Sequence, residues 1–304
     1  MNYPEFREEI FNALKDIVPK EISLELLQVE KLNSCIRFGI SFAKEGEPYA
    51  PTIYLEPFYR SFQKGRSIEA LAGELLRCYE EETSQIPESI HKMDSFETAK
   101  SDIYCKLIHI AANRNLLKDT PHVKFLDFAI VAYFEVDEAE IYKGSVLLKQ
   151  HHLAFWHISE EELLNSALAH TKAVKGVLFR PMSEVLSAYI SEDDGEMYER
   201  ARTGMFVLTN TEKYLGAVLV YFPEVLQMIA GHLQEDFYLL PASVHEWVIV
   251  PKSYVYDQAV LFSMVRNIND SEVLEEEVLS YNIYSYVTSS QKIYVFESTK
   301  EKNY

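Results

Sequence analysis

The sequence predicts an α+β protein with antiparallel or mixed sheets, flanking helices and two α+β parts. Hydrophobic residues make up 48% of the 304 residues and charged residues 25%, as in ordinary globular proteins. The chain holds 20 Tyr and 17 Phe against 2 Trp, and both abundant types are enriched in strands. Segments with helical spacing of apolar residues are interspersed with segments in which every second residue is apolar.

The first hundred residues predict two helices around a small sheet. Apolar residues recur at three- and four-residue spacing before Pro19, which predicts an N-terminal amphipathic helix. Residues 36–42 alternate between apolar and other side chains, as in a strand with one buried face. Residues 22–29 and 51–55 are expected to flank this strand in an antiparallel meander. A continuous apolar stripe predicts the second helix over residues 68–79.

The middle of the chain predicts a buried strand followed by a helix. Residues 123–134 are apolar on both faces apart from Lys124 and Asp127, which is typical of a central strand. Residues 144–156 are expected to pair beside it. Ser159 with Glu162 three residues later predicts a helix start by the capping-box pattern.

A change in composition predicts the division of the chain into domains. Residues 191–204 are charged and lack apolar periodicity, so we expect them to connect an N-terminal α+β domain, 1–190, to a C-terminal α+β domain, 205–304. The elements expected in the second domain are strands at 205–209, 215–221, 237–240 and 246–250, helices beginning at Pro223 and covering 260–268, and strand pairing within 281–296.

The net charge and the cysteine content restrict the kinds of partner that the protein can bind and the cellular compartment in which we expect it. A net charge of −18 repels phosphate backbones and anionic lipid surfaces, and no run of Lys and Arg occurs, so neither nucleic acid nor a membrane is an expected partner. The three cysteines form no C-x-x-C pair, which suits a reducing compartment. The charged N-terminus does not resemble a signal peptide, and the longest apolar stretches are about half the ~20 residues of a membrane helix. We therefore expect a cytoplasmic protein.

Three stretches carry a family resemblance. They read APTIYLEPFYRSFQKGRSIEALAGELL (residues 50–76), NLLKDTPHVKFLDFAIVAYF (residues 115–134) and DFYLLPASVHEWVIVP (residues 236–251). Together, and in this order, they resemble a domain-of-unknown-function family of Gram-positive anaerobic, Firmicutes-type, bacteria. The resemblance implies an intracellular bacterial protein, but no activity, cofactor or catalytic residue. The chain departs from the family pattern in having no long insert at 43–48 and in placing Trp247 after the His-Glu pair.

No linear catalytic motif is present, and two sets of residues are weak candidates for a site. The sequence lacks a glycine-rich phosphate loop, a G-x-S-x-G elbow and an H-E-x-x-H helix, so no cofactor is expected. Ser243, His245 and Glu246, beside a proline turn, have the residue types of a nucleophile, a base and an acid. On an extended segment, however, the first two side chains are ~6 to 7 Å apart, so an ordinary turn is favoured unless the backbone closes that gap.

Histidines provide the second candidate set. His151 and His152 are candidate metal ligands, with His157 on the same face as His151 if the segment is a strand. Six residues of strand span about 20 Å, which is too far for two ligands of one metal. A site would need His122 or His170 in addition, so surface or hydrogen-bonded histidines are favoured.

Asp127 and the Asp193-Asp194 pair are acidic residues that could act as an acid, a base or a cation ligand. Asp127 interrupts an apolar run, and an unpaired buried carboxylate is costly. A structural ion pair or cap bond is favoured over a tuned acid or base, and the partners expected from their nearness in sequence are His122, Lys124, Arg114 and Asn113. The Asp193-Asp194 pair does not have EF-hand spacing and is interpreted as part of a solvated linker.

These patterns leave two main functional hypotheses. The favoured one is a non-enzymatic binding or regulatory protein that contacts another protein or a small-molecule ligand, because a well-patterned core occurs without a catalytic motif. The alternative is a hydrolase-type enzyme with a site in a cleft between the two parts, using Ser243, His245 and Glu246. A protein that mimics DNA charge is disfavoured, because acidic and basic residues are interspersed.

Overall fold

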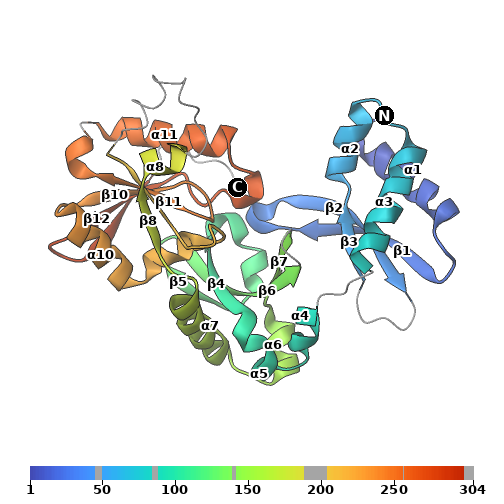
Figure 1. Cartoon of the computed structure of the whole chain (residues 1–304), viewed down its shortest axis with the longest axis horizontal. Coiled ribbons are helices and arrows are strands. Elements are labelled where there is room, and N and C mark those ends of the chain that lie inside the picture. Colours follow the sequence, from blue (N-terminus) through green and yellow to red (C-terminus); the bar gives the residue numbers. More distant parts are fainter. Residues whose placement is uncertain (45–49, 84–87, 139–141, 188–203, 256, 298–304) are drawn as a thin grey trace. The chain divides into compact units, whose positions relative to one another are not determined.

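A computed structural model describes residues 1–44, 50–83, 88–138, 142–187, 204–255 and 257–297, and it confirms the predicted α+β class (Figure 1). The chain forms two compact units, an N-terminal unit, Met1–His91, and a C-terminal unit, Lys92–Tyr304. The boundary therefore differs from the expected one near residue 190. Strands on either side of residues 188–203 pair within one sheet, which keeps both in the same unit. The predicted connecting segment, 191–204, lies outside the described residues except for Gly204.

The N-terminal unit is a three-stranded antiparallel sheet with helices. Its sheet has the order β1-β2-β3, so the predicted meander is confirmed. Side chains from α1, β2, β3 and α3 form its core, as the apolar spacing of the two longer helices predicts. The elements are α1 (Tyr3–Ile17), β1 (Ile22–Glu30), β2 (Ile36–Lys44), β3 (Thr52–Tyr54), α2 (Glu56–Gln63), α3 (Ile68–Thr83) and α4 (Glu88–His91).

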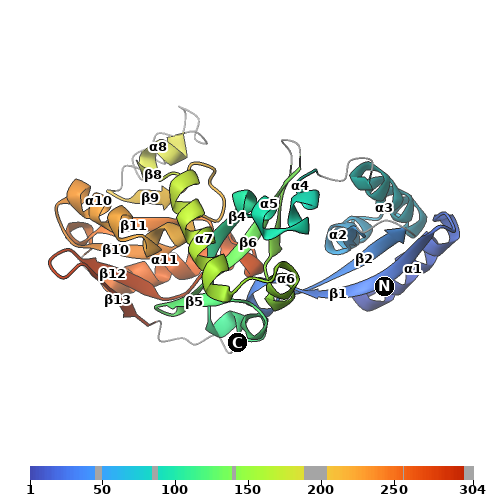
Figure 2. The same ribbon diagram turned by 90° about the horizontal axis from the view of Figure 1, so that it is seen from below.

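The C-terminal unit contains two sheets (Figure 2). One has four strands, with β4-β6-β5 in order and β7 paired to β6, and the other has six in the order β13-β12-β10-β11-β9-β8. The strands are β4 (Ile103–His109), β5 (His122–Phe125), β6 (Phe128–Glu138), β7 (Tyr142–Leu147), β8 (Leu178–Pro181), β9 (Phe206–Thr209), β10 (Phe237–Pro241), β11 (Trp247–Pro251), β12 (Ile283–Val287) and β13 (Lys292–Phe296). The helices are α5 (Phe96–Ala99), α6 (Gln150–Trp156), α7 (Glu160–Val174), α8 (Met182–Ser187), α10 (Pro223–Leu233) and α11 (Gln258–Ser271).

The two longest helices beside the six-stranded sheet, α10 and α11, lie on opposite sides of it (Figure 1). Alternate residues of β10, such as Tyr238 and Leu240, pack with Leu261 and Val265 of α11. The residues between them face the other way, and Phe237 stacks on its register partner Tyr286 there, with ring centroids 5.1 Å apart. The sheet is therefore buried on both faces, which explains the near-continuous apolar runs in its central strands.

The expected strand over residues 123–134 is wrong in one respect, because the chain reverses within it. β5 and β6 form a tight antiparallel hairpin, and Leu126 and Asp127 make its turn. Leu126 has a positive φ of 56°, which a continuous strand does not contain. The reversal was hidden because β6 begins with a continuous apolar run, and Val123, Phe125 and Leu126 extend that run on its N-terminal side.

Two further predicted strands are helical. Only the first part of the 144–156 segment pairs as β7, and the chain then forms α6, whose buried Leu153 and Trp156 are three residues apart, a helical spacing. Residues 216–221 form a 3₁₀ helix rather than a strand. Five consecutive residues of it are buried, and a fully buried run has no periodicity that separates a strand from a helix.

Ser159 caps α7 as predicted. Its side-chain oxygen accepts a hydrogen bond from the backbone N–H of Glu162 at 3.1 Å. We expect Ser159→Ala to lower the free energy of unfolding by about 1 kcal/mol, because an N–H at the helix start loses its acceptor. Chemical unfolding of the two proteins measures this difference, and Ser159→Asp, which restores an acceptor, should remain close to the wild type.

Candidate functional site

Ser243, His245 and Glu246 lie in the turn between β10 and β11, but they do not form a catalytic chain. Ser243 Oγ accepts a hydrogen bond from the backbone N–H of His245 at 3.0 Å rather than donating to its ring. The ring Nδ1 accepts from the backbone N–H of Leu215 at 3.0 Å. In a neutral ring the proton is therefore on Nε2, which lies 3.4 Å from a carboxylate oxygen of Glu277.

The ring of His245, in the β10-β11 turn, thus contacts the backbone of Leu215 and the side chain of Glu277, and it does not activate Ser243. The carboxylate nearest to its Nε2 belongs to Glu277, not to the neighbouring Glu246. Burial raises the pKa of Glu246, and the nearby charges of His245 and Lys213 oppose that shift. The backbone bond that Ser243 accepts is typical of a serine in a turn, which is the arrangement favoured by the sequence.

The candidate metal ligands lie on α6, not on a strand. The rings of His151 and His152 are in contact, with centroids 3.9 Å apart. His152 Nδ1 accepts a hydrogen bond from the Lys149 N–H at 3.0 Å, and burial with the adjacent His151 lowers the pKa of His152 to about 4. His157 ends the helix in a left-handed conformation.

The two supplementary histidines are engaged elsewhere. A ring nitrogen of His122 lies 2.8 Å from the Thr120 carbonyl, and one of His170 lies 3.1 Å from the Ile103 carbonyl. Within the described ranges, no group of three or more His, Cys, Asp or Glu side chains is placed to hold a metal ion.

Asp127 is held by partners that are distant in the sequence. Its carboxylate accepts hydrogen bonds from the Tyr284 hydroxyl at 2.8 Å and from the Asn282 amide at 2.9 Å, and His109 Nε2 is 3.5 Å away. Burial alone would raise the pKa of Asp127, but the bonds from His109, Tyr284 and Asn282 together lower it below its ordinary value. The structural role favoured by the sequence is consistent with this network, but the local partners expected for it are wrong.

A buried lysine, which sequence analysis did not identify, lies at the end of α7. Lys175 is 1% exposed, and its ammonium group donates to both carboxylate oxygens of Glu135, at 3.0 and 2.8 Å, and to Glu212 at 2.8 Å. The same nitrogen lies 3.8 Å from the centre of the Tyr104 ring. All three ammonium protons therefore have acceptors, as a buried cation requires. The only local signal is Gly176, whose positive φ marks a helix end.

A cavity of about 520 Å³, which we call the apolar pocket, opens at the start of α11. Its floor includes Val250 and Leu261, which are buried, and its rim includes Tyr254 and Val260, which are 61% and 57% exposed. The described residues that line it are Met205, Val250, Tyr254, Val255, Asp257, Val260, Leu261 and Met264. Among these described residues, Asp257 supplies the only charged side chain.

Tyr254 forms a fixed aromatic wall of this pocket. A Cβ atom placed on Gly204 would lie 2.2 Å from the Tyr254 ring, so the ring packs directly on the glycine backbone. Asp257 is also fixed, because one carboxylate oxygen accepts the Ala259 N–H at 2.9 Å and caps α11. The pocket thus combines apolar walls with a single acidic group.

One of three comparisons with known proteins finds a match for this chain. No helix in the described part of the chain has the length and apolar character needed to cross a bilayer. No curated protein and no solved structure matches the chain. Residues 3–288 match a family described as a family of unknown function, DUF5688. The match covers nearly the whole chain, which therefore belongs to the DUF5688 family.

Proposed function

We propose that this chain is a non-enzymatic binding protein that holds an apolar small molecule in the apolar pocket of its C-terminal unit. The observation that carries the proposal is the pocket itself, whose volume of about 520 Å³ lies within the range of small-molecule sites. Aliphatic and methionine side chains line most of it, and methionine adapts its shape to varied ligands.

The charge of the pocket restricts the ligand. Asp257 is the only charged residue among the described residues that line the pocket, and the whole chain carries a net charge of −18. An anionic ligand would be desolvated beside a carboxylate without a compensating cation. The exposed ring of Tyr254 presents a surface that attracts cations or other rings. The proposed ligand is therefore neutral or positively charged.

Binding of two fluorescent probes tests this proposal. The neutral dye Nile red is expected to bind the purified chain more tightly than the anionic dye anilinonaphthalene sulfonate. Val260→Trp should weaken Nile red binding by at least tenfold, because the larger side chain at the rim fills the pocket. Fluorescence titration measures both affinities.

Val174→Trp is the matched control. Val174 is 51% exposed on α7, compared with 57% for Val260 on α11, and it does not line the pocket. This variant should bind Nile red as the wild type does. Equal loss in both variants, or no loss in Val260→Trp, would contradict the proposed site.

The alternative hypothesis, a hydrolase-type enzyme, gains no support from Ser243, His245 and Glu246. The serine accepts a backbone bond, and the histidine ring is directed to Leu215 and Glu277. Turnover of ester substrates that is lost in Ser243→Ala would favour the enzyme instead.

A cytoplasmic location in a bacterium is part of the same proposal. None of Cys35, Cys78 and Cys105 forms a disulfide bond, which suits a reducing compartment. The net charge of −18 argues against nucleic acid as a partner. Recovery of the native protein outside the cytoplasm after cell fractionation would contradict the location.

A further inference from the structure

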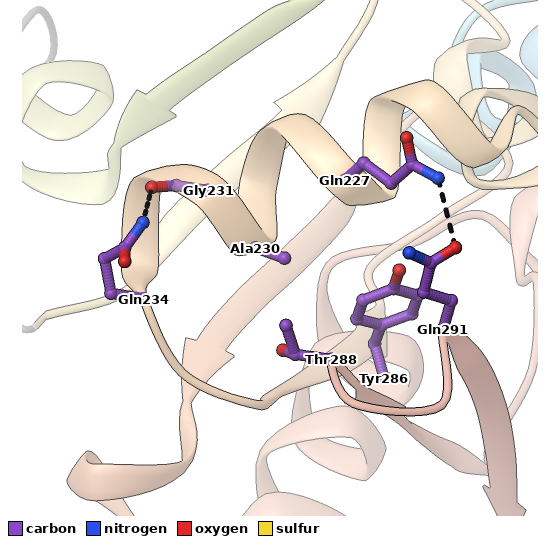
Figure 3. Close-up of a pocket in the computed structure, with 7 residues that line it drawn as sticks. All are labelled: Gln227, Ala230, Gly231, Gln234, Tyr286, Thr288 and Gln291. Carbon is purple, nitrogen blue, oxygen red and sulfur yellow. Dashed lines mark hydrogen bonds between the residues drawn. The ribbon is translucent and has the colours of Figure 1, made fainter.

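A second cavity, of about 400 Å³, lies on the α10 side of the six-stranded sheet (Figure 3). We call it the glutamine pocket. Residues of α10 form one wall, and the end of β12 with the following turn forms the other. The lining residues are Gln227, Ala230, Gly231, Gln234, Tyr286, Thr288 and Gln291, none of which is charged.

The glutamine side chains keep unused hydrogen-bonding groups at this pocket. Gln227 Nε2 donates to Gln291 Oε1 at 3.3 Å, and Gln234 Nε2 donates to the Gly231 carbonyl (Figure 3). Each amide has two donor protons and one acceptor oxygen. Gln227 therefore retains an acceptor oxygen, which is directed away from Gln291, and Gln291 retains an NH₂ group (Figure 3).

Tyr286 supplies a further unused group. Its side chain is 2% exposed, because the ring stacks on Phe237 within the sheet. Its hydroxyl nevertheless makes no hydrogen bond within the described part of the chain, and it is not among the oxygens sealed from solvent there. The hydroxyl therefore reaches solvent at the pocket, where it is open to a hydrogen-bonding partner. It is directed into the pocket toward Gln227 and Gln291 (Figure 3).

Gly231 keeps the pocket open. It lies inside α10, where glycine is unfavourable relative to residues with a side chain. A Cβ atom on Gly231 would meet no other atom within 4 Å, so packing does not require a glycine there. A side chain at this position would instead occupy space that lines the pocket.

We infer that the glutamine pocket binds a neutral polyhydroxylated ligand, a monosaccharide or a sugar unit of similar size. Hydroxyl groups act as donors and acceptors together, which matches the Gln291 NH₂ group and the Tyr286 hydroxyl at one pocket. A charged ligand would lose hydration there without gaining an opposite charge. The site is separate from the apolar pocket, which lies on the α11 side of the same sheet.

Saturation-transfer NMR on the full chain tests this inference. The probes are the methyl glycosides of glucose, galactose and mannose at millimolar concentration, with glucuronate as a charged comparison. At least one neutral glycoside is expected to receive saturation from the protein, and glucuronate is expected to receive less. Tyr286→Phe, which removes only the unpartnered hydroxyl, should weaken binding of that glycoside by about fivefold to tenfold.

Gly231→Leu and Gly73→Leu form a matched pair of variants. Gly73 also lies inside a helix, α3, and a Cβ atom on it would meet nothing within 4 Å, so both changes should maintain or raise the melting temperature. Only Gly231→Leu should abolish glycoside binding. Val260→Trp should leave it unchanged, which separates this site from the proposed function.

Three results would overturn the inference. They are the absence of transfer to all three neutral glycosides, transfer that is unchanged in Gly231→Leu and Tyr286→Phe, and stronger transfer to glucuronate than to the neutral sugars.

Discussion

Lys175→Met is expected to lower the free energy of unfolding of the C-terminal unit by about 3–5 kcal/mol. Removing one member of a buried ion pair leaves the other charge without compensation, and losses of this size are typical. Here the carboxylate left behind belongs to Glu135, whose side chain is 14% exposed and receives two of the three ammonium bonds. Glu212, at 29% exposed, can be hydrated more readily.

Tryptophan fluorescence during urea unfolding measures this loss of stability in the C-terminal unit. Both tryptophans, Trp156 and Trp247, lie between residues 92 and 304, so their signal follows the C-terminal unit alone. Methionine keeps most of the volume and the apolar stem of lysine, which confines the loss to the charge and its hydrogen bonds.

Lys172→Met is the matched control for this prediction. Lys172 lies three residues earlier on the same helix and pairs with Glu224, but its side chain is 58% exposed. An exposed pair contributes about 0–1 kcal/mol, so this variant should remain close to the wild type. A second variant, Lys175→Met with Glu135→Leu, should recover much of the loss, because no unpaired charge remains between them. Equal stability of Lys175→Met and the wild type would contradict a structural role for the buried lysine.

Asp127→Asn is expected to lower the stability of the same unit by about 1.5–3 kcal/mol at pH 7, the range for hydrogen bonds to a charged group. The change keeps the side-chain shape but removes the charge that accepts from the Tyr284 hydroxyl and the Asn282 amide. Urea unfolding followed by tryptophan fluorescence again measures the difference.

The contribution of Asp127 also depends on pH in a defined direction. Its folded-state pKa is lowered below the ordinary value of 3.8, so the folded state holds this proton less strongly than the unfolded state. The stabilisation is therefore complete above about pH 5, decreases as the pH falls below the unfolded-state value of 3.8, and is lost as the pH falls through the folded-state pKa. The stability difference between the wild type and Asp127→Asn should shrink over that range.

Asp94→Asn is the control for the pH series. Asp94 is exposed, so its replacement should change neither the stability at pH 7 nor its slope below pH 4. A difference between wild type and Asp127→Asn that stays constant down to pH 2 would show that the charge of Asp127 is not what stabilises the fold.

Local patterns in the sequence were sufficient to predict most of the elements in which one face is buried and the other is exposed. The first helix, the meander of β1, β2 and β3, the Ser159 cap and the Pro223 helix start all follow from residues within a few positions of each other. Alternation of period 2 and spacing of 3.6 are visible only when solvent contacts one side of the element. The wrong prediction over residues 215–221 falls where that contrast is absent. Over residues 144–156 the contrast is present in α6, but the exposed Phe155 adds an apolar side chain to the solvent face and imitates the alternation of a strand.

The partners of the polar groups were decided by the tertiary structure alone. The sequence indicated that Asp127 needs a partner, yet Asn282 and Tyr284 are 155 and 157 residues away. In the sequence, nothing distinguishes Lys175 from a surface lysine. It is buried between Glu135 and Glu212 because α7 packs against the four-stranded sheet. Both pockets are likewise assembled from segments that meet only in the folded sheet. The amino-acid sequence therefore determined the fold class, the charge, the longest helices and most strands of the described residues, because these depend on local spacing and composition. The binding sites depend on which distant segments the folded chain brings within a few ångströms, and that proximity leaves no local pattern.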